Sequence, residues 1–189
     1  MLYYEVRLSG SGGQGMMLAG TFLAEAAGVY DGHHIVLAKS YGPEARGGAC
    51  RSEVIISSTP IVYPEVQSPD LVLAMTQEAS DKYHKDIKPG GIMIIDPEFV
   101  KRKPSGPIII YEIPVTRIAR ETTGYEITAN VVALGSITAL VDWVSRGAMM
   151  KAILDRTPEG TEELNEKAFA AGFEVGKAAH GKKLAEKVP

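Results

Sequence analysis

One stretch decides the fold: Leu8-Ser-Gly-Ser-Gly-Gly-Gln-Gly-Met16. The residues before it, Tyr3 to Leu8, place positions 2, 4, 6 and 8 on one face and positions 3, 5 and 7 on the other, which predicts a strand. The residues after it, Met16 to Val29, are rich in helix formers and apolar side chains and predict a helix. The glycines between them allow positive φ angles and a close approach to the backbone. The unpaired amides and the positive dipole end of the helix favour an anion at this turn.

The spacing of Gly10, Gly12 and Gly15 matches the dinucleotide-binding pattern G-x-G-x-x-G, in which an acidic residue at the end of the second strand binds a ribose. The second predicted strand, His34 to Ala38, is followed by Lys39 and Ser40 instead of a carboxylate. Two interpretations therefore stay open. The loop binds an anion, or it is a tight turn that packs the first helix on the sheet.

Composition limits the class of protein. With 189 residues, of which 45% are hydrophobic, the chain is long enough for one full core. We expect a single domain over residues 3–180 and a charged tail over residues 181–189. The net charge of -3 gives no basic surface for nucleic acid. No apolar run approaches the ~20 residues that span a bilayer, and no signal peptide is recognisable, so we expect a cytoplasmic protein without a membrane partner.

The later part of the chain predicts a three-layer α/β/α fold with a mostly parallel sheet. Continuous apolar runs at 71–75, 92–95 and 108–110 are typical of central strands that are covered on both faces. The third strand, Ser52 to Ser57, follows only a glycine-rich loop, and it is a candidate antiparallel strand because parallel pairing needs a long connection. Helices are predicted over 77–87, with Thr76 as the N-cap, and over 115–121, 126–144, 148–155 and 161–177.

A second glycine-rich loop follows the second strand and carries Tyr41, Glu44, Arg46, Gly47 and Gly48. Arg46 is a candidate ligand for a phosphate, through its planar guanidinium. Alternatively, Glu44 and Arg46 form a pair that only shapes the loop. In open α/β sheets, ligand sites lie at the carboxyl ends of the strands, so we expect the two glycine loops to lie side by side there.

The chain has no P-loop, no zinc-ligand spacing and no serine nucleophile elbow, so neither a catalytic residue nor a metal ligand is predicted. Its one cysteine, Cys50, excludes an internal disulfide and a four-cysteine cluster within the chain. This thiol is either buried and inert or activated by the adjacent Arg51.

Together, the two loops resemble those of a known family. The motif Gly10-Ser-Gly-Gly-Gln-Gly15, followed by Ser40-Tyr-Gly-Pro-Glu-Ala-Arg-Gly-Gly48, is similar to the gamma subunit of 2-oxoacid:ferredoxin oxidoreductases. The similarity extends to Asn130 and covers roughly residues 3–180. It is closest to the type that acts on 2-oxoglutarate or on branched-chain 2-oxoacids such as ketoisovalerate.

This resemblance implies a thiamine-diphosphate-dependent complex that converts a 2-oxoacid to acyl-coenzyme A and reduces ferredoxin. It places thiamine diphosphate, Mg²⁺ and the iron–sulfur clusters on partner subunits of the alpha, beta and delta types, with coenzyme A as co-substrate. The sequence agrees, because it has no Gly-Asp-Gly motif and only one cysteine. The chain alone is then expected to bind no cofactor and to be inactive, while it helps assembly and contributes to the coenzyme A path.

The resemblance and the glycine patterns give one set of candidate binding residues. The amides of Gly12 to Gly15 would bind a phosphate or a carboxylate of a partner chain, and Asn130 would face either this loop or a partner. The full set is Gly10, Gly12, Gly13, Gln14, Gly15, Tyr41, Glu44, Arg46, Gly47, Gly48 and Asn130.

Two other functions remain open from the sequence. The glycine spacing alone is also compatible with a free-standing oxidoreductase that binds a nucleotide or a flavin, where Lys39 would suit the extra phosphate of NADP. A non-catalytic scaffold protein is the second alternative.

Overall fold

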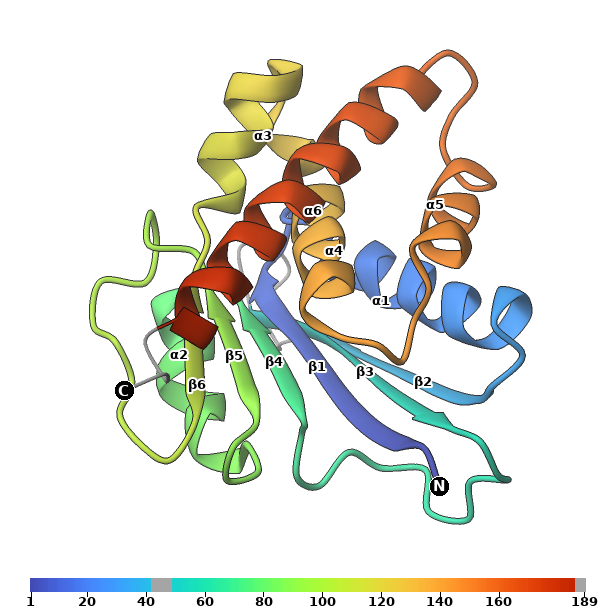
Figure 1. Cartoon of the computed structure of the whole chain (residues 1–189), viewed down its shortest axis with the longest axis vertical. Coiled ribbons are helices and arrows are strands. Elements are labelled where there is room, and N and C mark those ends of the chain that lie inside the picture. Colours follow the sequence, from blue (N-terminus) through green and yellow to red (C-terminus); the bar gives the residue numbers. More distant parts are fainter. Residues whose placement is uncertain (42–48, 186–189) are drawn as a thin grey trace.

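A six-stranded sheet forms the centre of the molecule (Figure 1), in the order β2-β3-β1-β4-β5-β6. The computed structural model describes residues 1–41 and 49–185. The strands are β1 (Tyr3–Ser11), β2 (His34–Tyr41), β3 (Ala49–Ser57), β4 (Leu71–Ala74), β5 (Ile92–Ile95) and β6 (Ile109–Glu112).

The sheet is mostly parallel with one antiparallel strand, as predicted. β3 runs antiparallel to both of its neighbours, β1 and β2, whereas β1, β4, β5 and β6 pair in parallel. The short connection between β2 and β3 explains this direction, since a parallel pair needs a crossover of a dozen or more residues.

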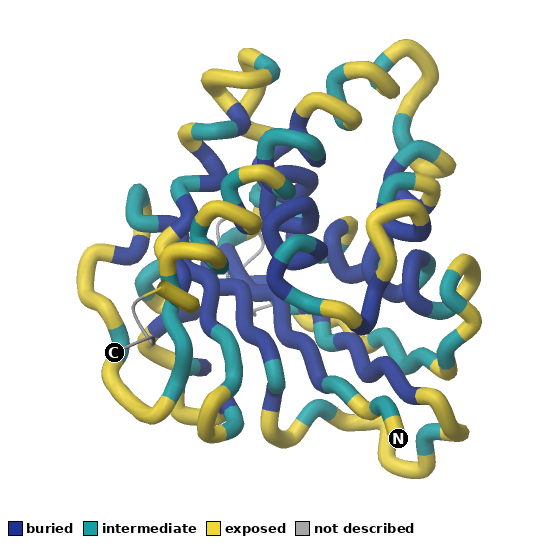
Figure 2. The backbone as a smooth tube through the Cα atoms, viewed as in Figure 1, coloured by how far each residue is buried: buried dark blue, intermediate teal, exposed yellow. Residues whose placement is uncertain are grey.

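Helices cover both faces of the sheet. α1 (Met16–Glu25), α4 (Ala129–Leu140), α5 (Arg146–Leu154) and α6 (Glu162–Ala185) pack on one face, and α2 (Gln77–Tyr83) packs on the other, with α3 (Val115–Thr123) above the strand ends (Figure 1). Successive residues of β4 contribute to different cores: Leu71 and Leu73 face the larger helix layer, and Val72 and Ala74 face α2. The central strands are therefore buried along their length (Figure 2).

Several boundaries differ from the sequence-based expectation. β6 is an edge strand, so the prediction that 108–110 is central is wrong, and two of its residues are only half-buried. The first helix ends in a π-helical turn, Ala26–Tyr30. The long helix expected over 126–144 divides into a 3₁₀ turn, Glu126–Thr128, and α4. α6 continues to Ala185, past the predicted end at residue 177 and into the predicted charged tail, and its C-terminal part packs on the sheet through the contact of His180 with Tyr111.

α4 and α6 pack at very short range through glycines. Beta carbons built on Gly135 and Gly172 would overlap with carbonyl oxygens of the facing helix, those of Phe169 and Val132. The hydroxyl of Ser136 donates a hydrogen bond of 3.0 Å to the Gly172 carbonyl. The small residues of α4 therefore serve packing within the chain.

Arg7 of β1 is buried on the α2 side of the sheet. Its Nε donates to Glu53 at 2.7 Å, and its Nη1 donates to Asp86 at 2.6 Å. Its guanidinium carbon lies 4.6 Å from the centre of the Tyr83 ring. Arg7 therefore connects β1 to β3 and to the helical segment that covers this face.

Within the described ranges, no helix combines the length and the apolar composition that a membrane crossing requires.

Candidate functional site

The glycine loop lies at the carboxyl end of β1, between the sheet and α1. Gly12 and Gly13 form an exposed turn, and Gly13 and Gly15 have φ angles of 96° and 74°. These values lie in the left-handed region, which glycine adopts without a steric cost. The sequence therefore places glycine where this turn requires it.

Gln14 fixes the shape of the loop. Its Oε1 accepts the amide of Ser11 at 2.8 Å, and its Nε2 donates to the Met75 carbonyl at 3.2 Å. A beta carbon on Gly10 would lie 2.5 Å from Gln14 Oε1 and 3.1 Å from the Met75 beta carbon. The Gln14 side chain therefore holds the loop against the end of β4 and uses its polar atoms within the protein. The missing side chain of Gly10 leaves the space for this contact.

In the first turns of α2 and α3 a side chain accepts a backbone amide, whereas the first turn of α1 has no such acceptor among the described residues. Thr76 caps α2 as predicted, by accepting the Ala79 amide at 3.2 Å. Asp96, which is fully buried, accepts the amide of Thr116 in α3 at 2.9 Å. The N-cap of α1 is Gly15, and no side chain of the described residues caps this helix. Its first amides are therefore available at the loop.

Asn130 packs against the glycine loop from the first turn of α4. It is only 4% exposed, and a beta carbon on Gly15 would lie 2.6 Å from its Nδ2. Its Oδ1 accepts the Val131 amide at 2.9 Å, which fixes the orientation of the side-chain amide. Among the described residues, Nδ2 has no hydrogen-bond acceptor, so a donor of this largely buried residue lies beside the uncapped end of α1. Of the two orientations expected for Asn130, the structure has the one toward the loop.

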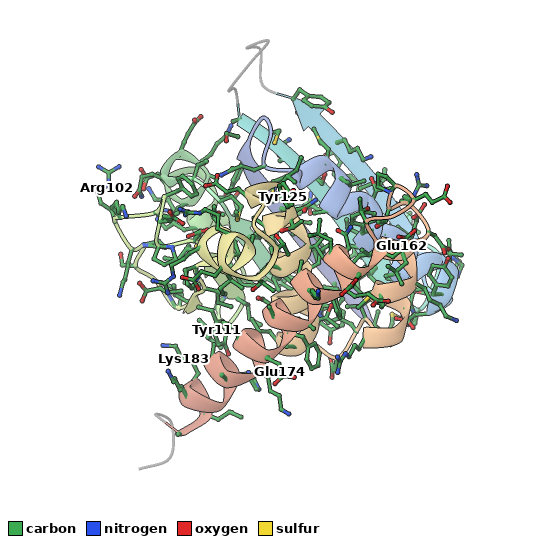
Figure 3. The ribbon with its side chains drawn as sticks, turned by 90° about the horizontal axis from the view of Figure 1, so that it is seen from above. Arg102, Tyr111, Tyr125, Glu162, Glu174 and Lys183 are labelled. Atoms are coloured by element: carbon green, nitrogen blue, oxygen red, sulfur yellow. The ribbon has the colours of Figure 1, made fainter. Side chains whose placement is uncertain are left out.

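A cavity of about 310 Å³ lies next to the loop. Phe99 and Ile127 contribute apolar surface to the cavity, although both are exposed. Figure 3 looks down on this end of the molecule and labels Tyr125, which is also exposed. The lining residues are Ser11, Gly13, Gln14, Met75, Phe99, Thr116, Glu126, Ile127 and Ala129.

The second loop begins and ends at the same end of the sheet as the first. Tyr41, the last residue of β2, pairs with Cys50, and Ser11 pairs with Ala49. Tyr41 is 75% exposed. Glu44, Arg46, Gly47 and Gly48 lie outside the described residues. The residues that flank this loop thus agree with the expectation that the two loops share one edge.

Cys50 is buried, and its burial raises the pKa of its thiol. The thiol donates to the Ser11 carbonyl at 3.4 Å, so the inert form is the one that the structure supports. No group of three or more His, Cys, Asp or Glu side chains suited to a metal ion occurs in residues 1–41 and 49–185.

Sequence reasoning missed the residues that complete this region: Asp96, Phe99, Thr116 and Ile127. Asp96 directly follows the apolar run of β5. A polar residue at the carboxyl end of a parallel strand is typical of a ligand site, so its position in the sequence could have identified it. Phe99 and Ile127 carried no comparable signal, because single apolar residues in loops are common.

Comparisons with known proteins agree with this arrangement. Residues 5–175 match the family described as pyruvate ferredoxin/flavodoxin oxidoreductase. The 2-oxoglutarate synthase subunit KorC of Methanocaldococcus jannaschii is 50% identical, over 92% of this chain and 94% of that protein. The crystal structure of the keto/oxoacid ferredoxin oxidoreductase gamma subunit from Geobacter sulfurreducens superposes with a TM-score of 0.87 at 47% identity, covering 95% of this chain and 99% of that one. The 2-oxoglutarate:ferredoxin oxidoreductase of Magnetococcus marinus gives a TM-score of 0.82 at 25% identity, with 96% of this chain covering 32% of that one.

The fold and the site define an α/β domain whose glycine loop connects the first strand to the first helix at the carboxyl end of the sheet. The chain belongs to the pyruvate ferredoxin/flavodoxin oxidoreductase family. The prediction of a gamma subunit of a multisubunit 2-oxoacid:ferredoxin oxidoreductase is thereby confirmed.

Proposed function

We propose that the glycine-loop end of this subunit binds a phosphate group of coenzyme A in the assembled enzyme. The observation that carries the proposal is the position of Asn130 against Gly15, at the uncapped first turn of α1: the residue is 4% exposed, and its Nδ2 has no hydrogen-bond acceptor among the described residues. Amide donors and the positive end of a helix dipole together suit a phosphate. The cavity beside them has apolar surface from Phe99 and Ile127 for the uncharged part of such a ligand.

The same proposal assigns the reaction to the whole complex. The substrate is a 2-oxoacid, with 2-oxoglutarate favoured, since the relative at 50% identity is a 2-oxoglutarate synthase subunit. Thiamine diphosphate, Mg²⁺ and the iron–sulfur clusters lie on alpha, beta and delta subunits, and ferredoxin accepts the electrons. In support, the solved enzyme of Magnetococcus marinus carries 2-oxoglutarate, coenzyme A and succinyl-CoA, and this chain matches 32% of it.

The first test separates this function from a free-standing oxidoreductase. We expect the purified chain to show no reduction of a viologen dye with a 2-oxoacid and coenzyme A, and full activity to return when the partner subunits are added. The physical reason is that a single cysteine cannot hold an iron–sulfur cluster of four cysteines. Turnover by the single chain, or a spectral change with NADPH, would contradict the assignment.

A second test addresses the loop itself. We expect Gly15→Ala to raise the Michaelis constant for coenzyme A about tenfold or more in the reconstituted complex. The reason is that φ is 74° at this position and a beta carbon would lie 2.6 Å from Asn130 Nδ2, so the loop must move.

Gly160→Ala is the matched control, because φ is 86° there and the added carbon meets nothing within 4 Å. It should cost similar backbone strain and leave the Michaelis constant unchanged. Equal effects of the two variants on coenzyme A kinetics would contradict the proposed role of the loop.

The second loop belongs to the proposal on the basis of its position. Tyr41, Glu44, Arg46, Gly47 and Gly48 would contact coenzyme A or a partner chain, with Arg46 as the phosphate or carboxylate ligand. We also predict that one domain covers residues 3–180, that residues 181–189 form a tail, and that the protein is cytoplasmic.

A further inference from the structure

No described helix covers the face of β2 and β3 that lies opposite α1. α2 packs on β4 and β5 in the other half of the sheet, and in Figure 1 no described helix lies behind β2. A cleft of about 370 Å³ occupies this face of β2 and β3, between the strands and the segment 64–66. It is lined by Arg7, Val36, Ala38, Lys39, Ser40, Arg51, Glu53, Ile55, Pro64, Glu65 and Val66.

Arg51 is the cation of this cleft with unused hydrogen-bonding capacity. Its Nε is enclosed by protein and lies 3.3 Å from Glu53, yet it makes no hydrogen bond. Its Nη1 donates only a long bond of 3.4 Å to the Tyr83 hydroxyl, and its Nη2 has no acceptor among the described residues. An arginine presents five N–H donors in a planar fork, so most of this fork is unused.

The two carboxylates of the cleft make shorter contacts with other groups than with Arg51. Glu53, whose side chain is 12% exposed, accepts the shorter bond of 2.7 Å from Arg7. Glu65, at the rim, accepts the hydroxyl of Tyr63 at 2.9 Å. Arg51 therefore shares the carboxylate that Arg7 holds more closely, and among the described residues it has no carboxylate of its own.

We propose that this cleft, on the face of β2 and β3 opposite α1, is a docking site for a partner subunit that places an aspartate or glutamate side chain on the Arg51 guanidinium. The proposal rests on the membership of this chain in a multisubunit enzyme. The apolar floor of Val36, Ala38 and Ile55 suits the stem of such a side chain and its neighbours. The exposed outer edge of β2 gives a partner segment further backbone groups to pair with.

The register of the sheet offers a sharp test at Ser40. Ser40 is exposed and lies directly opposite Arg51 on the same face, because the two residues pair across β2 and β3. In Ser40→Glu, a carboxylate of this chain should therefore occupy the guanidinium and exclude the partner's carboxylate. Ser40→Gln is the matched control, because it has the same size without the charge.

Binding of each variant to the isolated partner subunits is measured by titration calorimetry at low and at physiological salt. We expect Ser40→Glu and Arg51→Gln to weaken association at least tenfold, and Ser40→Gln and Arg117→Gln to match the wild type. Arg117 is an exposed residue of α3 that serves as the surface control. The melting temperature of the free chain should be unchanged or higher in Ser40→Glu, which excludes misfolding as the cause.

The outcomes also separate this inference from the proposed function. If the wild-type chain fails to associate with the partner subunits, the assignment to the complex is wrong. If it associates and Ser40→Glu binds equally well, the docking site is wrong while the assignment stands. Saturation of the Arg51 side-chain NMR signals by micromolar acetate in the free chain would indicate a small-anion site and would also overturn the docking proposal.

Discussion

Replacement of Arg7 by methionine should lower the free energy of unfolding by about 3 kcal/mol, since removing one member of a buried ion pair leaves the other charge uncompensated. The side chain of Arg7 is 6% exposed, and Glu53, its partner at 2.7 Å, is 12% exposed. The substitution also removes the contact with the Tyr83 ring and the bond to Asp86. Urea unfolding at 25 °C measures the loss.

Two companion variants show whether burial causes the effect. Arg102→Met removes an arginine whose side chain is 76% exposed and pairs with Asp81, so it should cost less than about 1 kcal/mol. Arg7→Met combined with Glu53→Met removes both charges and should recover part of the loss. If Arg7→Met costs no more than Arg102→Met, the network of Arg7 does not hold the sheet to the α2 side.

Gly172→Ala should destabilise the chain by about 3 kcal/mol, the upper part of the range for overpacked cores. The added carbon would overlap with the Val132 carbonyl oxygen and would lie 2.7 Å from the carbonyl carbon. These atoms belong to the backbone of α4, which cannot move aside as a side chain does. The two helices must therefore separate, and the hydrogen bond of Ser136 to the Gly172 carbonyl is lost.

Gly181→Ala is the control for this change. Gly181 lies in the same helix, and a beta carbon there meets nothing within 4 Å. Alanine favours the helix over glycine, so this variant should gain about 0.5–1 kcal/mol. Thermal unfolding of the two variants should thus give shifts of opposite sign, and shifts of the same sign would contradict the packing argument.

Local signals in the sequence predicted the parts of the fold that depend on neighbouring residues. The glycines at 10–15 predicted the turn between β1 and α1, and Thr76 predicted the start of α2. The short link before β3 predicted its antiparallel direction. Each of these depends on backbone geometry within a few residues, which the residue types reveal directly.

The remaining features depend on segments that are distant in the sequence. The alternation in β1 suggested one polar face, but Glu5 and Arg7 are buried because segment 66–68 and the α2 side cover them. The sequence allowed Asn130 to face either the glycine loop or a partner chain. Its orientation toward the loop follows from the packing of α4 against Gly15, which the sequence does not reveal. The apolar run of β6 could not reveal an edge position, because strand order follows from the whole sheet.

The order of the sheet also sets how quickly the chain can fold. β2 and β3 are neighbours both along the chain and in space, so their pairing closes only a short loop. β1 pairs with two strands, β3 and β4. Its pairing with β4, Leu71–Ala74, closes a long loop that contains β2 and β3. Contacts of such large sequence separation slow folding. We therefore expect β1 to join an antiparallel unit that forms early to a parallel one that forms late, with the folding barrier at this junction.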